Sequence, residues 1–233
     1  PARQASIGAN LPTSVECMTI NKVCGSGLKS VMLADNSVKL NNSDIVIAGG
    51  MENMSRAPYY LNNGRGGLSF GNDKLIDSII YDGLWDPYNN ILMGNCGEIL
   101  CKEKKYSRED QDEYAIDSYS KAKKAIDKGL FKDEIIKVKI NDKKGSKIID
   151  IDEEPLKFNK KKFLNLKPAF DKNGTITAAN ASSLSDGAAA VLIASSKKVE
   201  EYKLKPIAKI IGQASFATDP IYFTKAPIYA IEK

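Results

Sequence analysis

The stretch Thr19-Ile-Asn-Lys-Val-Cys24-Gly-Ser-Gly-Leu-Lys-Ser-Val31 decides how the rest of the chain is interpreted. A β-branched, partly apolar run at residues 15–23 leads up to the cysteine, and apolar residues at helical spacing follow the glycines. The pattern predicts a strand, a tight turn and a helix over residues 27–40. Cys24 would then sit at a helix N-terminus, where free N–H groups and the positive end of the helix dipole favour an anion.

This placement would make Cys24 a usable nucleophile, because a cysteine at a helix N-terminus ionises more easily than a free one. Gly25 and Gly27 would let a substrate carbonyl approach the backbone, whose N–H groups can hold a developing oxyanion. The chemistry this suits is acyl transfer through a thioester. By spacing alone, an isolated cysteine is more often small core filler than a nucleophile.

Two later blocks accompany the cysteine motif, and they appear in a fixed order along the chain. They are Gly49-Gly-Met-Glu-Asn-Met-Ser55 and the pair Asn173-Gly-Thr-Ile-Thr-Ala-Ala-Asn-Ala-Ser182 with Asp186-Gly-Ala-Ala-Ala190. Together with Asn21-Lys-Val-Cys24-Gly-Ser-Gly-Leu-Lys29, they resemble the thiolase family. The Cys-Gly-Ser-Gly form is similar to the biosynthetic acetoacetyl-CoA type, and the run from Asp219 to Tyr229 resembles its mitochondrial members.

The resemblance implies an α/β fold, the layered α-β-α-β-α arrangement of thiolases, here incomplete. Residues 1–52 and 170–203 would form most of the N-terminal half. Residues 53–169 would form the inserted loop domain with the coenzyme A site, and residues 204–233 the start of the C-terminal half. The chain would thus be a middle segment of a thiolase.

The implied activity is an acyltransferase that forms acetoacetyl-CoA from two acetyl-CoA molecules through acetyl-Cys24, or the reverse thiolysis. Acetyl-CoA and coenzyme A would be its partners, no cofactor would be required, and a homodimer or homotetramer is expected. Thiolases take their acid/base groups from a Gly-His-Pro block, a second cysteine block and an Asn-Glu-Ala-Phe block. This sequence has none of these and no histidine, so we expect the 233 residues alone to be inactive.

The resemblance also assigns substrate contacts. Met93 would lie near the bound acyl group, and the contacts to the pantetheine and adenine would come from Leu84, Phe170, Ala178, Ser182 and Leu184. Lys157 would approach the nucleotide, and a potassium ion, where one binds, would lie near Ala178, Ala179 and Ala181. Leu92 stands where acetoacetyl-CoA thiolases often have a histidine, which removes a polar contact near the substrate. Each apolar member, taken singly, is equally well explained as plain core.

Two alternatives remain beside the acetyltransferase. A ketoacyl synthase or hydroxymethylglutaryl-CoA synthase would share the fold, but the Cys24 and Gly49-Gly50 blocks argue against it. A degenerate, non-catalytic thiolase kept for coenzyme A binding or subunit assembly is favoured by the absence of histidine, by Leu92 and by Pro155, which stands where the potassium-dependent mitochondrial members have a tyrosine near their ion.

Composition excludes several other classes. Hydrophobic residues make up 42% of the chain, and the net charge of +5 comes almost wholly from lysine. No arginine cluster interleaved with aromatic residues indicates nucleic-acid binding, and no apolar run is long enough for a transmembrane helix. The four cysteines lack the spacing of a disulfide framework or a zinc clip. A reducing compartment fits best, mitochondrial or cytoplasmic.

Further elements are expected from local patterns. Ser107 to Asp110 reads as a capping box that opens a helix ending near Gly129, with Tyr114, Ala115, Tyr119, Ala122 and Ile126 on its apolar stripe. The remaining expectations are a helix over residues 1–9, a parallel-type strand at 44–48, a hairpin of 134–141 with 147–151, a buried strand at 188–194, a helix at 197–202, a strand at 207–211 and a strand-like run just before Lys233.

Overall fold

The computed structural model describes residues 1–142 and 145–233. The chain divides into two compact units, residues 1–79 with 185–215 and residues 80–184 with 216–233. These units are defined by contacts within the chain and do not test the predicted limits of the thiolase domains, which stay a prediction.

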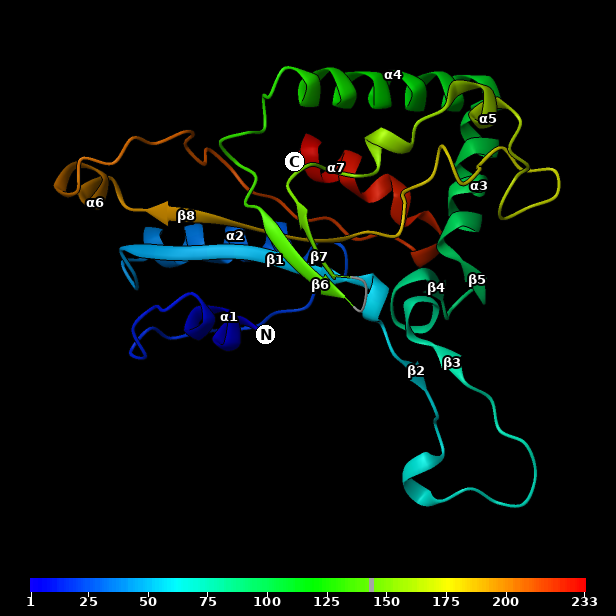
Figure 1. Cartoon of the computed structure of the whole chain (residues 1–233), viewed down its shortest axis with the longest axis horizontal. Coiled ribbons are helices and arrows are strands. Elements are labelled where there is room, and N and C mark those ends of the chain that lie inside the picture. The colour runs from blue at the N-terminus through cyan, green and yellow to red at the C-terminus, as the bar shows by residue number, and fades with distance from the viewer. Residues whose placement is uncertain (143–144) are drawn as a thin grey trace. The chain divides into compact units, whose positions relative to one another are not determined.

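The first unit is built on a two-stranded antiparallel sheet. Strand β1 (Ile45–Asn53) pairs with β8 (Asp186–Ala194) along its whole length, from Ile45 opposite Ala194 to Asn53 opposite Asp186. Helix α2 (Ser26–Lys39) packs against both strands, and Figure 1 shows it running beside them. The helix expected at residues 27–40 is therefore confirmed.

The expected direction and burial of these strands are wrong. The run at residues 44–48 pairs antiparallel rather than parallel, and every residue of β8 is at least partly exposed. Ala48 is the one buried residue of β1. A continuous apolar run indicates that a strand can be covered on both faces, but it does not encode the direction of its partner. The helix α2 covers only part of this pair.

Small residues let α2 and β8 approach β1 closely. A Cβ at Gly49 would lie 2.3 Å from the carbonyl oxygen of Ala189, and one at Gly50 would lie 3.3 Å from the Cα of Gly27. The hydroxyl of Ser30 on α2 lies 2.9 Å from the carbonyl oxygen of Gly49. The Gly49-Gly50 pair is thus required by the packing of three backbones.

The remaining elements of the first unit are short. They are α1 (Ala2–Gly8), the 3₁₀ turns η1 (Met54–Arg56) and η2 (Gly64–Gly66), the paired strands β2 (Tyr59–Tyr60) and β3 (Ile76–Asp77), and α6 (Ser196–Glu201). The helices expected at residues 1–9 and 197–202 are confirmed. The strands expected at 15–23 and 207–211 are wrong, because no strand of the described residues pairs with either segment, and a strand exists only through its partner.

The second unit is mainly helical. It contains α3 (Met93–Lys104), α4 (Arg108–Asp127), α5 (Lys160–Leu164) and α7 (Ala226–Glu232), with the 3₁₀ turns η4 (Pro155–Lys157) and η5 (Pro220–Lys225). Its strands are β4 (Trp85–Asp86) with β5 (Ile91–Leu92), and β6 (Val138–Asp142) with β7 (Gly145–Ile149). The π-helical turn η3 (Ile79–Leu84) leads into β4. The strand-like run expected just before Lys233 is wrong, since this segment forms α7.

Local signals predicted α4 well. The Ser107 hydroxyl accepts from the Asp110 N–H at 3.0 Å and the Asp110 carboxylate accepts from the Ser107 N–H at 2.9 Å, which confirms the capping box. Four of the five stripe residues are half-buried, but Tyr114 is 79% exposed. Tyr114 lies one position before the stripe, and one residue turns a helix by about 100°.

The predicted hairpin forms as β6 and β7, while its turn residues Lys143 and Lys144 lie outside the described residues. None of the helices that the structure describes has both the length and the apolar character needed to cross a bilayer.

We predict that Gly49→Ala destabilises the first unit by about 1–3 kcal/mol, because the added Cβ would collide with the backbone of β8. Gly187→Ala in β8 is the matched control, since a Cβ there meets nothing within 4 Å. Denaturant unfolding followed by circular dichroism measures both variants. Equal stabilities for the two would show that the close approach of β1 and β8 is wrong.

Candidate functional site

Cys24 lies at the start of α2, directly before the N-cap residue Gly25, and its side chain is exposed. The other three cysteines are less accessible: Cys17 and Cys101 are half-buried, and Cys96 is fully buried. The predicted position of Cys24 at a helix N-terminus, open to solvent, is confirmed.

A strained turn holds Cys24 in this place. The residue before it, Val23, has a φ of +48°, in the left-handed region that β-branched residues avoid. The N–H of Val23 donates to the Asn21 side-chain oxygen at 2.8 Å. The hydroxyl of Ser26 accepts from the N–H of Lys22 at 2.8 Å and donates to the carbonyl oxygen of Val23 at 2.7 Å. Such a conformation costs about 1–3 kcal/mol and persists only where its surroundings impose it.

Asn21 and Ser26 were not among the predicted functional residues. The available signal was their type, because Asn and Ser side chains bond to nearby backbone groups and favour turns.

Backbone N–H groups are available at the start of α2. The N–H of Gly25 donates to Lys22 O at 3.0 Å and that of Ser26 to Val23 O at 3.2 Å. For the next two, Gly27 and Leu28, no acceptor is found among residues 1–142 and 145–233. These two donors, one turn from Cys24, can bind an anion or a developing oxyanion.

The buried thiols are poor nucleophiles by contrast. Burial, with a further contribution from the charge of Asp86, raises the pKa of the Cys96 thiol. Burial also raises the pKa of the Cys101 thiol. Since the thiolate is the reactive form, the chemistry of this chain is expected at Cys24.

In the second unit, Phe170 lies against Gly94, the residue that follows Met93. Met93 is the first residue of α3, and a Cβ at the next residue, Gly94, would lie 2.4 Å from ring atoms of Phe170. The Asn95 side chain donates to the carbonyl oxygen of Phe170 at 3.0 Å and accepts from the N–H of Leu92 at 3.2 Å. Gly94 therefore allows the Phe170 ring to lie against the start of α3.

The loop that follows Phe170 is fixed to α3 by the carboxylate of Glu98. Glu98 accepts from the N–H of Thr175 at 2.9 Å and from the N–H of Ile176 at 2.7 Å. Thr177 is fully buried. Three predicted binding residues of the same segment, Ala178, Ser182 and Leu184, are exposed. These three are therefore available to a ligand rather than being part of the core.

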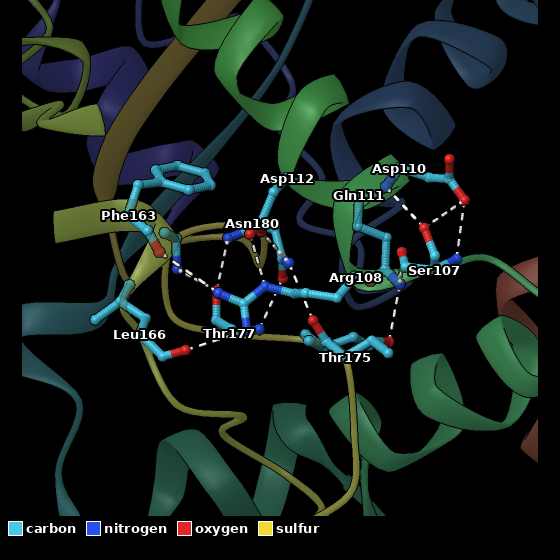
Figure 2. Close-up of polar contacts among 12 residues, drawn as sticks. Ser107, Arg108, Asp110, Gln111, Asp112, Phe163, Leu166, Thr175, Thr177 and Asn180 are labelled. Atoms are coloured by element: carbon cyan, nitrogen blue, oxygen red, sulfur yellow. Dashed lines mark hydrogen bonds and ion pairs between the residues drawn. The ribbon is translucent and has the colours of Figure 1, made fainter. Parts of the chain in front are cut away.

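The loop is also tied to α4, as Figure 2 shows for Asp112, Asn180 and Thr175. Gln111 of α4 donates to the hydroxyl of Thr175 at 2.8 Å. Glu98, Gln111 and Asp112 were not predicted, because their loop partners are distant in sequence and no local pattern signals them.

Lys157 lies in η4 and is already paired. Its ammonium lies 2.9 Å from the Glu154 carboxylate, and this hydrogen bond raises the pKa of Lys157. The next residue, Phe158, lines a cavity of about 450 Å³ on α4. The other lining residues are Ser120, Lys123, Lys124, Asp127 and Lys128. These three lysines were not predicted, since a charge run usually marks a solvated face.

Cys24 thus belongs to the first unit, and the seven predicted binding residues belong to the second. Leu84 ends the turn η3 and is half-buried. Over the part of the chain that the structure describes, no group of three or more His, Cys, Asp or Glu side chains could hold a metal ion.

Comparison with known proteins finds a matching family model, similar sequences and similar solved structures. The family model for the N-terminal domain of thiolase matches residues 1–197. An acetyl-CoA acetyltransferase from Yarrowia lipolytica is 54% identical over 99% of this chain. Among solved structures, a thiolase from Ascaris suum in complex with coenzyme A has a TM-score of 0.91 at 42% identity, again over 99% of this chain. Human mitochondrial 3-ketoacyl-CoA thiolase has a TM-score of 0.92 at 36% identity and the same coverage.

These matches confirm the resemblance drawn from the three sequence blocks, and with it the α/β fold. The chain spans 57% of the length of the Yarrowia relative and 59% of each of the two solved chains.

We predict that iodoacetamide modifies Cys24 at least about tenfold faster than Cys96 in the folded chain, because Cys24 is exposed and Cys96 is not. Peptide mass spectrometry over a time course measures each thiol. Denatured chain is the control, in which the two rates should converge. Faster labelling of Cys96 in the folded chain would contradict the structure.

Proposed function

Because this chain belongs to the thiolase family, we propose that it serves acetyl transfer through Cys24. The reaction is the formation of acetoacetyl-CoA from two acetyl-CoA molecules, or its reversal by thiolysis. The observation that carries the proposal is the exposed Cys24 thiol at the start of α2. The acetyl-CoA acetyltransferase from Yarrowia, at 54% identity, supports the choice of acyl group.

In the first half-reaction of this chain the Cys24 thiol loses its proton to solvent, and its sulfur attacks the thioester carbonyl carbon. The bond between that carbon and the coenzyme A sulfur breaks, and coenzyme A leaves and takes up a proton. The free N–H groups of Gly27 and Leu28 are suited to stabilise the negative charge that develops on the carbonyl oxygen. The strained turn at Val23 holds the sulfur at this helix end.

The second half-reaction needs a base that removes a proton next to the thioester of a second acetyl-CoA. The sequence contains no histidine, and thiolases take this base from blocks absent from these 233 residues. We therefore propose that the chain by itself accepts an acetyl group but does not turn over.

The coenzyme A arm is proposed to lie in the second unit. Met93 and Phe170 would contact it beside the start of α3, and Ala178, Ser182 and Leu184 along the exposed edge of the loop. Leu84 would add an apolar contact. Because Lys157 is paired with Glu154, the nearby cavity with Phe158 and three lysines offers the additional cations for the phosphates.

Three further features stay predictions from the family. A homodimer or homotetramer, and a mitochondrial or cytoplasmic location, are expected. A potassium ion would take the carbonyl oxygens of Ala178, Ala179 and Ala181, which are the ligand type that hard cations prefer.

We predict that acetyl-CoA acetylates Cys24 of the chain and leaves the other cysteines unmodified. Intact and peptide mass spectrometry would detect the added acetyl group, with Cys24→Ser and iodoacetamide-blocked chain as controls. Coenzyme A binding without acetylation of Cys24 would instead favour the non-catalytic thiolase. Sustained thiolysis of acetoacetyl-CoA would contradict the need for a base from elsewhere.

We predict that Lys124→Ala with Lys128→Ala weakens binding of coenzyme A about tenfold and that of dephospho-coenzyme A about twofold, since a lost cation is felt most by the ligand with the extra phosphate. Calorimetry measures both ligands. Lys102→Ala with Lys104→Ala on α3 is the control with the same change of charge. Equal losses in the two double variants would show that the α4 cavity is not the phosphate site.

A further inference from the structure

A buried carboxylate on α4 has no place in the chemistry above. Asp112 is 4% exposed, and its Oδ2 lies 2.7 Å from the Nε of Arg108. Its other oxygen, Oδ1, accepts from the Nδ2 of Asn180 at 2.9 Å. Figure 2 shows the contacts of both partners with Asp112. Each carboxylate oxygen is thus committed to a different element.

Asn180 passes this contact on to the loop. Its side-chain oxygen accepts from the N–H of Thr177 at 2.7 Å, and its Nδ2 also donates to the carbonyl oxygen of Thr175 at 3.1 Å. The hydroxyl of Thr177 accepts from the N–H of Ala179 at 3.2 Å, and the N–H of Ala181 donates to Thr177 O at 3.0 Å. The side chains of Asn180 and Thr177 therefore set the shape of the turn at residues 177–181, and only Asn180 links it to Asp112.

Arg108 fixes Asp112 from the other side. Its guanidinium also donates to the carbonyl oxygen of Leu166 at 3.1 Å and to that of Phe163 at 3.5 Å. Arg108 is therefore anchored to the segment around α5, and Asp112 cannot rotate away without losing an ion pair. Asp112 is therefore held in one position, and through Asn180 it supports the turn at residues 177–181.

A contribution to folding stability does not by itself explain why a buried ion pair of Arg108 and Asp112 is present. The desolvation of a buried ion pair offsets much of its attraction, and well-packed apolar residues of similar volume often serve a fold equally well. The Asp112 carboxylate instead imposes a defined geometry, because its hydrogen bonds to Arg108 and Asn180 are directional and hold both side chains in place.

We propose that Asp112 is a positioning residue for coenzyme A binding. Through Asn180 it fixes the turn that presents Ala178 and leads into Ser182, both of them exposed. This inference rests on the proposed function, which places the pantetheine arm along that turn. Asp112 itself does not touch the ligand; it acts through Asn180.

The test is Asp112→Asn in the full chain. An amide can accept from Arg108 or from Asn180, but its NH₂ group then faces the other donor, so one of the two contacts is lost. We expect the dissociation constant for coenzyme A and for pantetheine to rise about tenfold, the equivalent of about 1.4 kcal/mol. Binding of adenosine bisphosphate, the nucleotide portion of coenzyme A, should stay within about twofold, because the proposed function places its phosphates at the cavity on α4 rather than along the turn.

Asp117→Asn is the matched control. Asp117 is on the same helix and pairs with Lys121, but its side chain is 58% exposed. It gives the same change of charge and should leave all three affinities unchanged. Asn180→Ser is the second variant: it keeps the pair of Arg108 with Asp112 and removes the link to the turn, so it should reproduce the loss for coenzyme A and pantetheine.

The outcomes separate the two proposals. If the unsubstituted chain binds neither coenzyme A nor pantetheine, the proposed function fails, and the inference with it. If the unsubstituted chain binds them and both variants bind as well, the positioning role alone is overturned. Equal losses for pantetheine and adenosine bisphosphate would also overturn it, since a merely structural role would move both ligands together. Weaker binding of coenzyme A and pantetheine, with unchanged binding of adenosine bisphosphate, would support the positioning role.

Discussion

The close approach of α2 to β1 is the constraint on which the first unit depends. Gly50 faces Gly27 at the second residue of α2, and Gly49 faces the carbonyl oxygen of Ala189 on β8. Any side chain at these positions would push α2 or β8 away from β1. Because Gly49 and Gly50 have no side chains, the start of α2 can lie close to β1. This close approach fixes the position of Cys24, which directly precedes the helix.

The turn before α2 places the Cys24 thiol at the start of the helix, where it is exposed. Once α2 is seated, the chain has to enter it sharply, and Val23 takes a left-handed conformation to do so. Asn21 and Ser26 stabilise this entry through hydrogen bonds to the backbone of Lys22 and Val23. The strain is therefore local, and it is offset by side chains within the motif itself.

The sequence predicted those parts of the fold that are encoded locally. The capping box at Ser107, the hairpin of β6 with β7 and the helix after Cys24 each follow from residues a few positions apart. The direction of β1 and the supposed strand at residues 15–23 depend on a partner far along the chain, and both expectations were wrong. The site divides in the same way: the motif identified Cys24, whereas the support of the loop by Asp112 and Glu98 joins residues 68 and 77 positions apart.

The second unit holds its loop by a different means from the glycine packing of the first. Glu98 of α3 binds the N–H groups that begin the loop, and Asp112 of α4 fixes its far turn through Asn180. Because the loop is ordered before any ligand arrives, a ligand that binds there would not bear the entropy of ordering it. Charged groups are suited to this task, since a buried carboxylate left without its donors is far more costly than a small gap between apolar side chains. The loop can therefore keep one shape while its outward residues stay exposed.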